Sequence, residues 1–487
     1  MKEIFWAIIR FGSGQIAALL CAAVSIKIMA VSIGPAGVGL FSLLRQTQQT
    51  LGALATMGGQ NAIVQGVASR TGQERDRFVV TIFWAFLASS IVLAGVAIGL
   101  AGPLTELVLR LDPNDWGALF GWIAIPVTAG AMHVFFRSVL NAHMRIGSVA
   151  MTNVAAGAGT LLLVYPTIVF YQRGHSAALM LLLGGSLALG AVYGALRARA
   201  CGYLGMFRRD EIRTFSLPAL RHFLSVALPS LIALFAGMAS VLAVRAFVAH
   251  WHGLEGAGQF DAAWTISVFY LSVFLSALHS YLLPALSKDP AQAPSQGVLD
   301  QSVRLALIVS VPMITSLVVL KPFVVRLLYS EEFLDSLSLL RWTLIGDYLR
   351  VGGWILATSL VARADMRAYL SCELLWNTIL TGGAFWLVER GIEGVGPVYL
   401  GAYAAYLAAL IFRARTHHRY RVERGTLALW VAGALIVLIT SILTWTDTHV
   451  DWANTGLIVL AAILSWFTMT PVERKALRAT LLGSFVR

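Results

Sequence analysis

Three of the cations that lie inside long apolar stretches of the sequence, where a charge is costly, are candidates for binding a substrate. Lys27, Arg45 and Arg245 each fall in such a stretch. A charged side chain at the centre of a bilayer costs at least about 2.5 kcal/mol, so a retained one is a functional candidate. Together the three suit an anionic substrate such as a diphosphate, which alone in hydrocarbon would cost on the order of tens of kcal/mol. For Lys27 and Arg245, the alternative is that the side chain snorkels to the outer surface.

Polar side chains accompany Arg45 at helical spacing. Steps of three and four residues lead from Arg45 through Gln49 to Gln60, so these side chains share one helix face. The neighbouring Gln46 and Gln48 are also compatible with plain hydrogen bonding between helices. The uncharged side chains that we expect to contact sugars are Gln49, Gln60, His279 and Asn377.

Acidic side chains in the apolar stretches are candidates for binding a coupling ion or for balancing a cation. Asp261 would balance Arg45, either as a structural pair or while sensing a coupling cation. Asp347 and Arg350 are three residues apart and are able to pair with each other on one helix. Glu373 serves either as an uncharged hydrogen-bonding group or as a coupling-ion site.

The composition predicts the elements that carry these residues. The chain has 487 residues, of which 58% are hydrophobic and only 12% are charged, and its mean hydropathy is +0.76. An average soluble domain has about 25% charged residues, so a soluble enzyme, a disordered chain and a disulfide scaffold are excluded. We predict an all-α polytopic membrane protein with about 14 transmembrane helices. The predicted spans are 6–32, 38–66, 79–101, 116–136, 148–171, 177–196, 222–248, 259–286, 305–320, 338–362, 370–390, 395–412, 427–446 and 454–470.

The distribution of Lys and Arg predicts the orientation. Most of them fall in alternate loops on the side of the N-terminus, which places both termini in the cytoplasm. This asymmetry explains the net charge of +12 better than nucleic-acid binding does. The sequence has no phosphate-binding loop and no zinc-type Cys/His spacing, so we expect no cofactor and no metal. We place residues 321–336 either in a loop or in an interfacial helix on the outer side.

A short motif recurs in the two halves of the chain. The pattern G-x-x-G-x-G-x-F occupies 34–41 and again 253–260, in what we interpret as outer loops, with an offset of 253 − 34 = 219 residues. A parallel repeat of this kind is a common transporter plan. We therefore predict two pseudo-symmetric six-helix lobes and a C-terminal two-helix hairpin. The expected domains are an N-terminal lobe at 1–205, a cytoplasmic linker at 206–221, a C-terminal lobe at 222–425, and a hairpin with a basic tail at 426–487.

Two segments that contain the motif resemble Wzx-type flippases, which transport lipid-linked oligosaccharides. These segments are IGPAGVGLFSLLRQTQQTLGALATMGG at 33–59 and GLEGAGQFDAAWTISVFYLSVFLSALHSYLLPALS at 253–287. The resemblance extends over roughly residues 1–425 and places the chain in the superfamily of MATE exporters and peptidoglycan-precursor flippases. Family members usually have twelve spans, so the hairpin at 427–470 departs from their pattern and is similar to that of the fourteen-span peptidoglycan flippases.

The resemblance implies a function. It implies two lobes around a cationic cavity in the bacterial inner membrane. An undecaprenyl-diphosphate-linked oligosaccharide would cross from the inner to the outer leaflet, by alternating access coupled to an ion gradient or the membrane potential. The family's cavity cations match Arg45 and Arg245 best, and Lys27 next. A polysaccharide polymerase and a chain-length regulator are the expected partners besides membrane lipid.

Three other functions compete with this hypothesis. A peptidoglycan-precursor flippase would be essential for growth. A MATE-like multidrug exporter would prefer acidic residues in its cavity, whereas the cations within these spans are prominent. A membrane glycosyltransferase or ligase would need a large outer loop and clustered carboxylates, which the sequence lacks.

Overall fold

The computed structural model describes residues 2–106, 119–203, 215–287, 296–363, 365–418, 420 and 422–469. Within them the regular structure is entirely helical, and nine segments are long and apolar enough to cross a membrane. The α-helices are α1 Lys2–Ala55, α2 Gln60–Ala68, α3 Gly72–Gly99, α4 Ala101–Leu104, α6 Ala124–Ala142, α7 Ile146–Gln172, α8 Ala178–Ala200, α9 Leu217–Ser287, α10 Gln296–Leu328, α11 Ser336–Ala362, α12 Met366–Leu387, α13 Val395–His418, α14 Arg424–Leu443 and α15 Thr455–Thr468. The prediction of an all-α polytopic membrane protein is confirmed.

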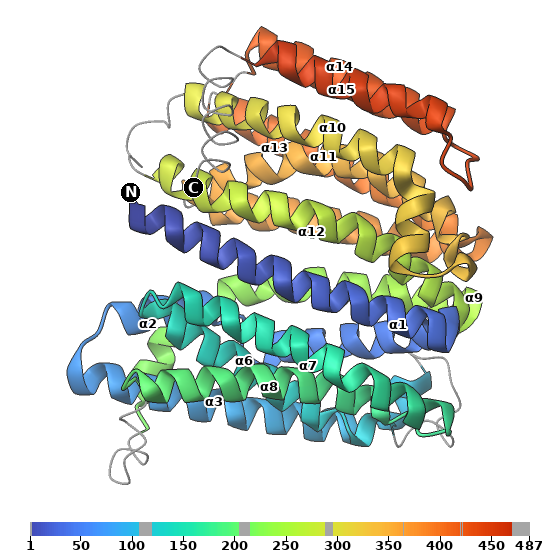
Figure 1. Cartoon of the computed structure of the whole chain (residues 1–487). Helices are drawn as coiled ribbons and strands as arrows, with labels where there is room; N and C mark the ends of the chain where they lie inside the picture. The colour runs from blue at the N-terminus through green and yellow to red at the C-terminus, as the bar shows by residue number, and fades with distance from the viewer. Residues whose placement is uncertain are drawn as a thin grey trace. The chain divides into compact units, whose positions relative to one another are not determined.

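The expected outer loops at the repeated motif are instead one-residue kinks. At Gly34 the backbone has φ 62° and ψ −172°, a conformation that glycine adopts at little cost. The chain turns back there, so the second half of α1 runs in the opposite direction (Figure 1). Pro35 follows, as is favourable at the first position of a helix. Gly253 in α9 has nearly the same dihedral angles, φ 67° and ψ −172°.

The third glycine of each motif copy brings two backbones into contact. A Cβ placed on Gly39 would lie 1.9 Å from the carbonyl oxygen of Leu254. A Cβ on Gly258 would lie 2.0 Å from the carbonyl oxygen of Pro35. Each motif copy therefore packs its glycine against the start of the other copy, and neither site has room for a side chain.

The predicted span 38–66 is broken near its inner end. Helix α1 ends at Ala55, Met57 (φ 52°) and Gly58 (φ 62°) form a turn, and α2 starts at Gln60. The Gly58 amide donates to the Ala53 carbonyl at 3.0 Å and closes the helix end. Met57 holds the left-handed conformation, which costs a residue with a Cβ about 1–2 kcal/mol.

The chain forms two compact units. Unit 1 comprises Met1–Gly258 with Leu328–Ser330, and unit 2 comprises Gln259–Leu327 with Glu331–Arg487. In unit 1, α7 packs against α1 and α8, and α8 packs against α6. A core of aromatic rings joins α3, α6 and α9 in unit 1, where Phe86 contacts Phe135 and Phe223 edge-on.

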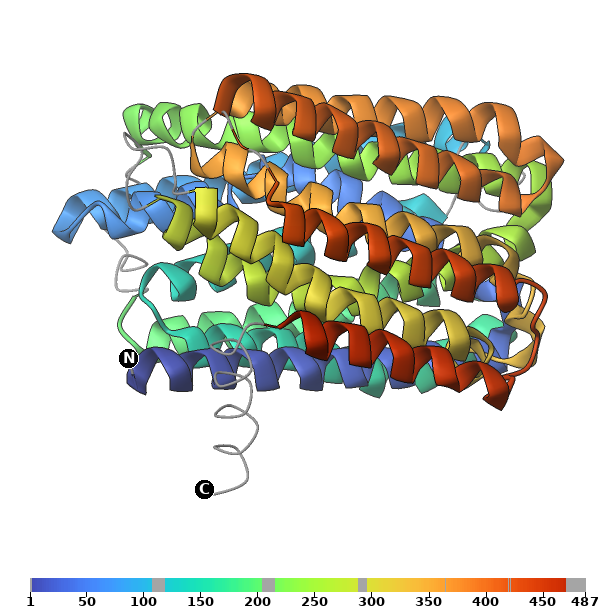
Figure 2. The same cartoon turned by 90° about the horizontal axis from the view of Figure 1, so that it is seen from above.

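In unit 2, the terminal hairpin of α14 and α15 lies beside α10 (Figure 2), and hydrogen bonds with charged side chains of α10 join the two. Asp300 accepts hydrogen bonds from the Glu423 amide and from Thr426 at the start of α14. Lys321 donates to the backbone oxygen of Thr444 at 2.6 Å, at the end of α14. Each charge thus faces the helix end of opposite partial charge. Arg304 of α10 donates to the last turn of α15.

The position of Lys321 corrects a prediction. We expected residues 321–336 in an outer loop or interfacial helix, but α10 continues to Leu328 and a short 3-10 turn follows at Glu331–Phe333. Lys321 is buried, and Thr444 and the Val318 carbonyl accept hydrogen bonds from its ammonium group. The apolar periodicity did not reveal this tertiary partner, so the charge was mistaken for a loop residue.

Candidate functional site

The charged residues of the predicted site divide between the two units by their predicted role. The three candidate diphosphate ligands Lys27, Arg45 and Arg245 belong to unit 1. The residues predicted to bind a coupling ion or balance charge all belong to unit 2; they are Asp261, Asp347, Arg350 and Glu373. Each group is described within its own unit.

Arg45 and Gln49 lie on an accessible stripe of α1. Arg45 is half-buried with its guanidinium 5.7 Å from the ring centre of Phe41, and Gln49 is exposed. Gln46 and Gln48, in contrast, are buried and donate to the backbone oxygens of neighbouring helices, at 3.1 and 3.3 Å. The interpretation of plain helix–helix hydrogen bonding therefore fits Gln46 and Gln48. An accessible polar stripe on an apolar helix is expected to face water or protein, not lipid.

The other two cations of unit 1 are more enclosed. The ammonium group of Lys27 donates to the backbone oxygen of Tyr329, and the side chain is half-buried. Arg245 of α9 is only 2% exposed. A side chain that snorkels would reach the surface, so the burial of Arg245 opposes the snorkelling alternative.

The four predicted sugar contacts are in different settings. Gln49 is exposed on α1, whereas Gln60, at the start of α2, accepts a hydrogen bond from Arg137 at 2.7 Å. Asn377 is buried in unit 2 and donates to the backbone oxygen of Glu373 at 2.8 Å. The side chain of His279 lies outside the described residues.

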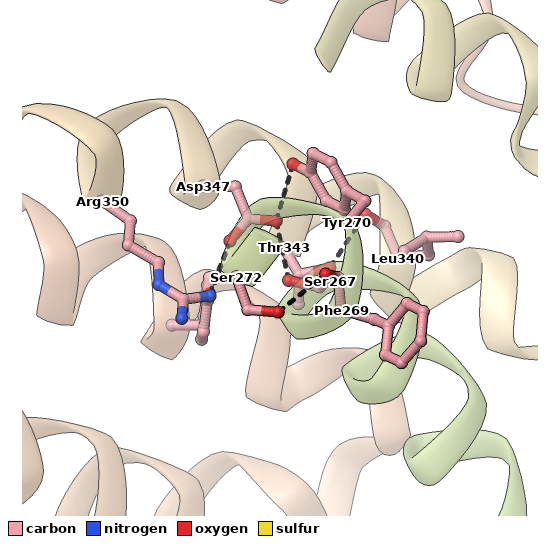
Figure 3. A network of polar contacts seen from close by, with 9 residues as sticks. Ser267, Phe269, Tyr270, Ser272, Leu340, Thr343, Asp347 and Arg350 are labelled. Atoms are coloured by element: carbon pink, nitrogen blue, oxygen red, sulfur yellow. Dashed lines mark hydrogen bonds and ion pairs between the residues drawn. The ribbon is translucent and has the colours of Figure 1, made fainter. Parts of the chain in front are cut away.

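Asp347 is the centre of a buried polar network in unit 2 (Figure 3). Its Oδ2 accepts hydrogen bonds from Ser267 at 2.7 Å and Tyr270 at 3.0 Å, both from α9. Its Oδ1 accepts one from Tyr399 of α13 at 2.7 Å. The Arg350 Nη1 lies 3.6 Å from the same Oδ1. The three hydroxyls and one cation together favour an ionised carboxylate at a residue with 0% exposure.

A row of tyrosines on α13 connects this network to a second carboxyl group. The Tyr403 ring lies 4.8 Å from that of Tyr399 and 6.0 Å from the Arg350 guanidinium. One turn further, Tyr406 donates to the Glu373 Oε1 at 2.6 Å. Sequence reasoning missed these tyrosines. Their spacing at i, i+4 and i+7 within the span 395–412 was the available signal.

Asp261 is also buried, at 2% exposure. Thr265, one turn along α9, donates to its Oδ1 at 3.4 Å. Asp261 lies in unit 2 and Arg45 in unit 1, so their pairing stays a prediction.

The donor set gives no sign of a metal centre. Among the described residues no cluster of three or more His, Cys, Asp or Glu side chains is placed to hold a metal ion. The three cysteines Cys21, Cys201 and Cys372 are free thiols.

The sequence is similar to a family of known proteins. Residues 28–338, more than half of the chain, match the family described as "Polysaccharide biosynthesis protein". The chain belongs to this family. It is 26% identical over 395 residues to the lipid III flippase of Escherichia coli (strain K12), covering 78% of this chain and 91% of the relative. A relative of the same name from Shigella flexneri matches equally.

Solved structures share the fold. The lipid II flippase MurJ in an inward closed conformation superposes with a TM-score of 0.71 at 12% identity, over 98% of this chain and 100% of that chain. An inward-facing multidrug resistance MATE transporter of the MOP superfamily has a TM-score of 0.59 at 15% identity, over 90% and 99% of the two chains. The chain is therefore a multi-pass membrane protein with a transporter fold, and its relatives are transporters, not enzymes.

Proposed function

We propose that this protein is a flippase that moves an undecaprenyl-diphosphate-linked oligosaccharide repeat unit from the cytoplasmic to the periplasmic leaflet, for surface polysaccharide synthesis. The observation that carries the proposal is the group of three cations in the apolar helices of unit 1. Fixed cations in a wet site lower the cost of bringing a diphosphate into the membrane, while the polyprenyl chain stays in lipid. The relatives named lipid III flippase support a lipid-linked substrate.

In this proposal, Arg45 and Arg245 bind the diphosphate together with Lys27. The accessible Gln49, next to Arg45 on the same stripe, is placed to meet the first sugar. Gln60 already pairs with Arg137, and Asn377 belongs to unit 2, so we give Gln49 the leading role among the predicted sugar contacts.

The acidic network of unit 2 supplies the coupling. Asp347, Arg350 and Glu373 belong to unit 2, whereas the cations of the proposed diphosphate site belong to unit 1. We propose that an ion bound in unit 2 biases alternating access, while the substrate binds in unit 1. The protein would lie in the bacterial inner membrane with both termini in the cytoplasm and would deliver its product to a polysaccharide polymerase and its chain-length regulator.

A peptidoglycan-precursor flippase is the second candidate. The similarity in fold to the lipid II flippase MurJ over nearly the whole chain, including the terminal hairpin, favours it. Identity of 12% supports the fold alone, so the substrate decides between the two candidates. A MATE-like exporter of cationic drugs is disfavoured because the accessible charge on α1 is positive.

The test uses a deletion strain. Polyprenyl-diphosphate oligosaccharides are extracted, and their accessibility to an enzyme added at the periplasmic face is measured. We expect complete repeat units to accumulate and to stay inaccessible. Plasmid-borne wild type should restore export, whereas Arg45→Ala and Arg245→Ala should not, at equal membrane levels.

A matched control is Arg341→Ala. Arg341 also lies in a predicted span, but its guanidinium is stacked 4.9 Å from the ring centre of Trp445 in unit 2, so its loss should leave export intact. An unchanged and fully accessible lipid-linked pool in the deletion strain would remove the proposed function. Arrest of growth with accumulation of the peptidoglycan precursor would promote the second candidate.

A further inference from the structure

In unit 2, two neighbouring carboxyl groups share one nearby cation among the described residues. Asp347 of α11 and Glu373 of α12 are joined through the tyrosine row of α13. Arg350 is the cation, and it lies 3.6 Å from Asp347. If both carboxyl groups were ionised, the network would carry one uncompensated negative charge in an apolar surrounding, which is strongly disfavoured.

The contacts indicate which carboxyl group is balanced. Asp347 has three hydroxyl donors and the guanidinium, so its anion is fully solvated by the protein. Glu373 has a single hydroxyl donor, Tyr406, and no cation among the described residues lies within 4.0 Å of its oxygens. Carboxyl groups in such surroundings retain a proton more readily than paired ones do.

The wider surroundings of Glu373 add no second cation that would pair with its carboxylate. The titratable and charged groups around it are Tyr369 and Cys372 on α12, Arg350 on α11, and Tyr403 and Tyr406 on α13. Only Arg350 among these carries a charge near neutral pH, and its near partner is Asp347.

Burial also differs between the two carboxyl groups. Asp347 is 0% exposed, whereas Glu373 is half-buried. Protonation or deprotonation of Glu373 therefore requires no loss of the hydrogen bonds that Asp347 accepts. Asp347 would first have to lose hydrogen bonds that tie α11 to α9 and α13.

We infer that Glu373 is the residue of unit 2 that binds and releases one proton, and that Asp347 and Arg350 form a fixed ion pair beside it. This deepens the proposed function, on which it rests: the coupling ion is a proton, and its site is Glu373. Release of the proton leaves an anion on α12 that accepts a hydrogen bond from Tyr406 and that attracts Arg350 electrostatically. The stability of the contact between α12 and α13 therefore depends on whether Glu373 carries its proton.

The experiment measures the proton directly. Purified full-length protein in lipid nanodiscs is examined by infrared difference spectroscopy between neutral and alkaline pH, in water and in heavy water. We expect the carbonyl band of one protonated carboxylic acid to decrease as the pH rises. The band should be absent in Glu373→Gln and retained in Asp347→Asn. A band that survives in Glu373→Gln, or that disappears in Asp347→Asn instead, would overturn the inference.

Two further measurements keep the inference testable if one variant folds poorly. In Tyr406→Phe the band should shift, because the carboxyl group loses its only described hydrogen-bond donor, whereas the exposed Tyr165→Phe should leave it unchanged. Stabilisation of the wild type by sodium at constant pH, without the carboxylic acid band, would assign the site to a metal cation and refute the proton. The spectroscopy needs no substrate, so its result does not depend on the proposed function. If the carboxylic acid band behaves as expected but deletion of the gene leaves the lipid-linked pool unchanged, the proton site stands and only the proposed flippase function is contradicted.

Discussion

Replacement of Asp347 by Asn should destabilise unit 2 strongly, because it leaves Arg350 without its counter-ion. Removal of one partner of a buried ion pair costs about 3–5 kcal/mol, and the Arg350 side chain is 18% exposed, which places the expected cost at the lower end. The Asn amide group is also unable to accept from the two hydroxyls that now contact Oδ2, at about 1 kcal/mol each. We expect a total loss of about 4–6 kcal/mol.

Thermal unfolding of the purified protein in detergent measures this loss. At about 2–4 °C per kcal/mol for a domain of 150–250 residues, Asp347→Asn should lower Tm by about 10–20 °C. The additional change Arg350→Met removes the unpaired charge, and we expect the double variant to recover at least half of the loss. The pair of Arg326 and Glu331, at 3.5 Å with the Glu331 side chain 83% exposed, is the exposed control; its coupling should not exceed about 1 kcal/mol.

The comparison between the two ion pairs decides the outcome. The effects of Asp347→Asn and Arg350→Met on the free energy of unfolding could prove additive, or the double-mutant cycle of this buried pair could give no more coupling energy than the cycle of the exposed pair. Either result would show that Asp347 is not ionised beside Arg350. The charge balance argued for unit 2 would then be wrong.

The remaining predictions concern the backbone of unit 1. Gly39→Ala and Gly258→Ala should each lower Tm and reduce export, because the new Cβ would meet a carbonyl oxygen at about 2 Å and overpacking costs at least about 1–3 kcal/mol. Gly237 lies in the same helix as Gly258 but has open space around its Cβ position, so Gly237→Ala should raise Tm by the equivalent of about 0.5–1 kcal/mol. A Tm change of the same sign for all three variants would refute the close contact between the two motif copies. Met144→Gly should also raise Tm slightly, because Met144 is 75% exposed and has φ 55°, so glycine relieves about 1–2 kcal/mol of strain at an entropic cost of about 0.5–1 kcal/mol. A lower Tm for Met144→Gly in differential scanning calorimetry would show that the side chain contributes more than its conformation costs.

The pairing of Asp347 with Arg350 illustrates what local spacing is able to predict. Residues three apart on a helix are neighbours whatever surrounds them, so the ion pair followed from the span assignment alone. Glu373 and Asn377 were related in the same way, and they are joined by a hydrogen bond from the Asn377 side chain to the Glu373 backbone. The three hydroxyls on Asp347 come from residues 52 to 80 positions away, and no spacing rule points to them.

The repeated glycine motif also had one feature that the sequence predicted and one that only the tertiary structure decided. Its glycine pattern was visible at an offset of 219 residues, but whether it formed a loop or a kink depended on how closely the helices approach. Gly34 supplies the positive φ that reverses the chain, and Gly39 supplies a surface without a side chain for the crossing with Leu254. The charge of Lys321 suggested an outer loop or helix end because its tertiary partner Thr444, directly after α14, is 123 residues away.

The sequence by itself determined the membrane class, the helical spans and the approximate positions of the polar stripes. Hydrophobicity and helical periodicity are local properties, and they decide whether a segment enters the bilayer as a helix before any tertiary contact forms. The tertiary structure decided which polar groups are satisfied and which stay accessible. It buried Gln46 and Gln48 against carbonyl oxygens while leaving Arg45 and Gln49 accessible, and it gave Asp347 a full set of donors but Glu373 only one. Such differences depend on contacts between helices that are far apart in the chain, and these contacts exist only once the helices have packed.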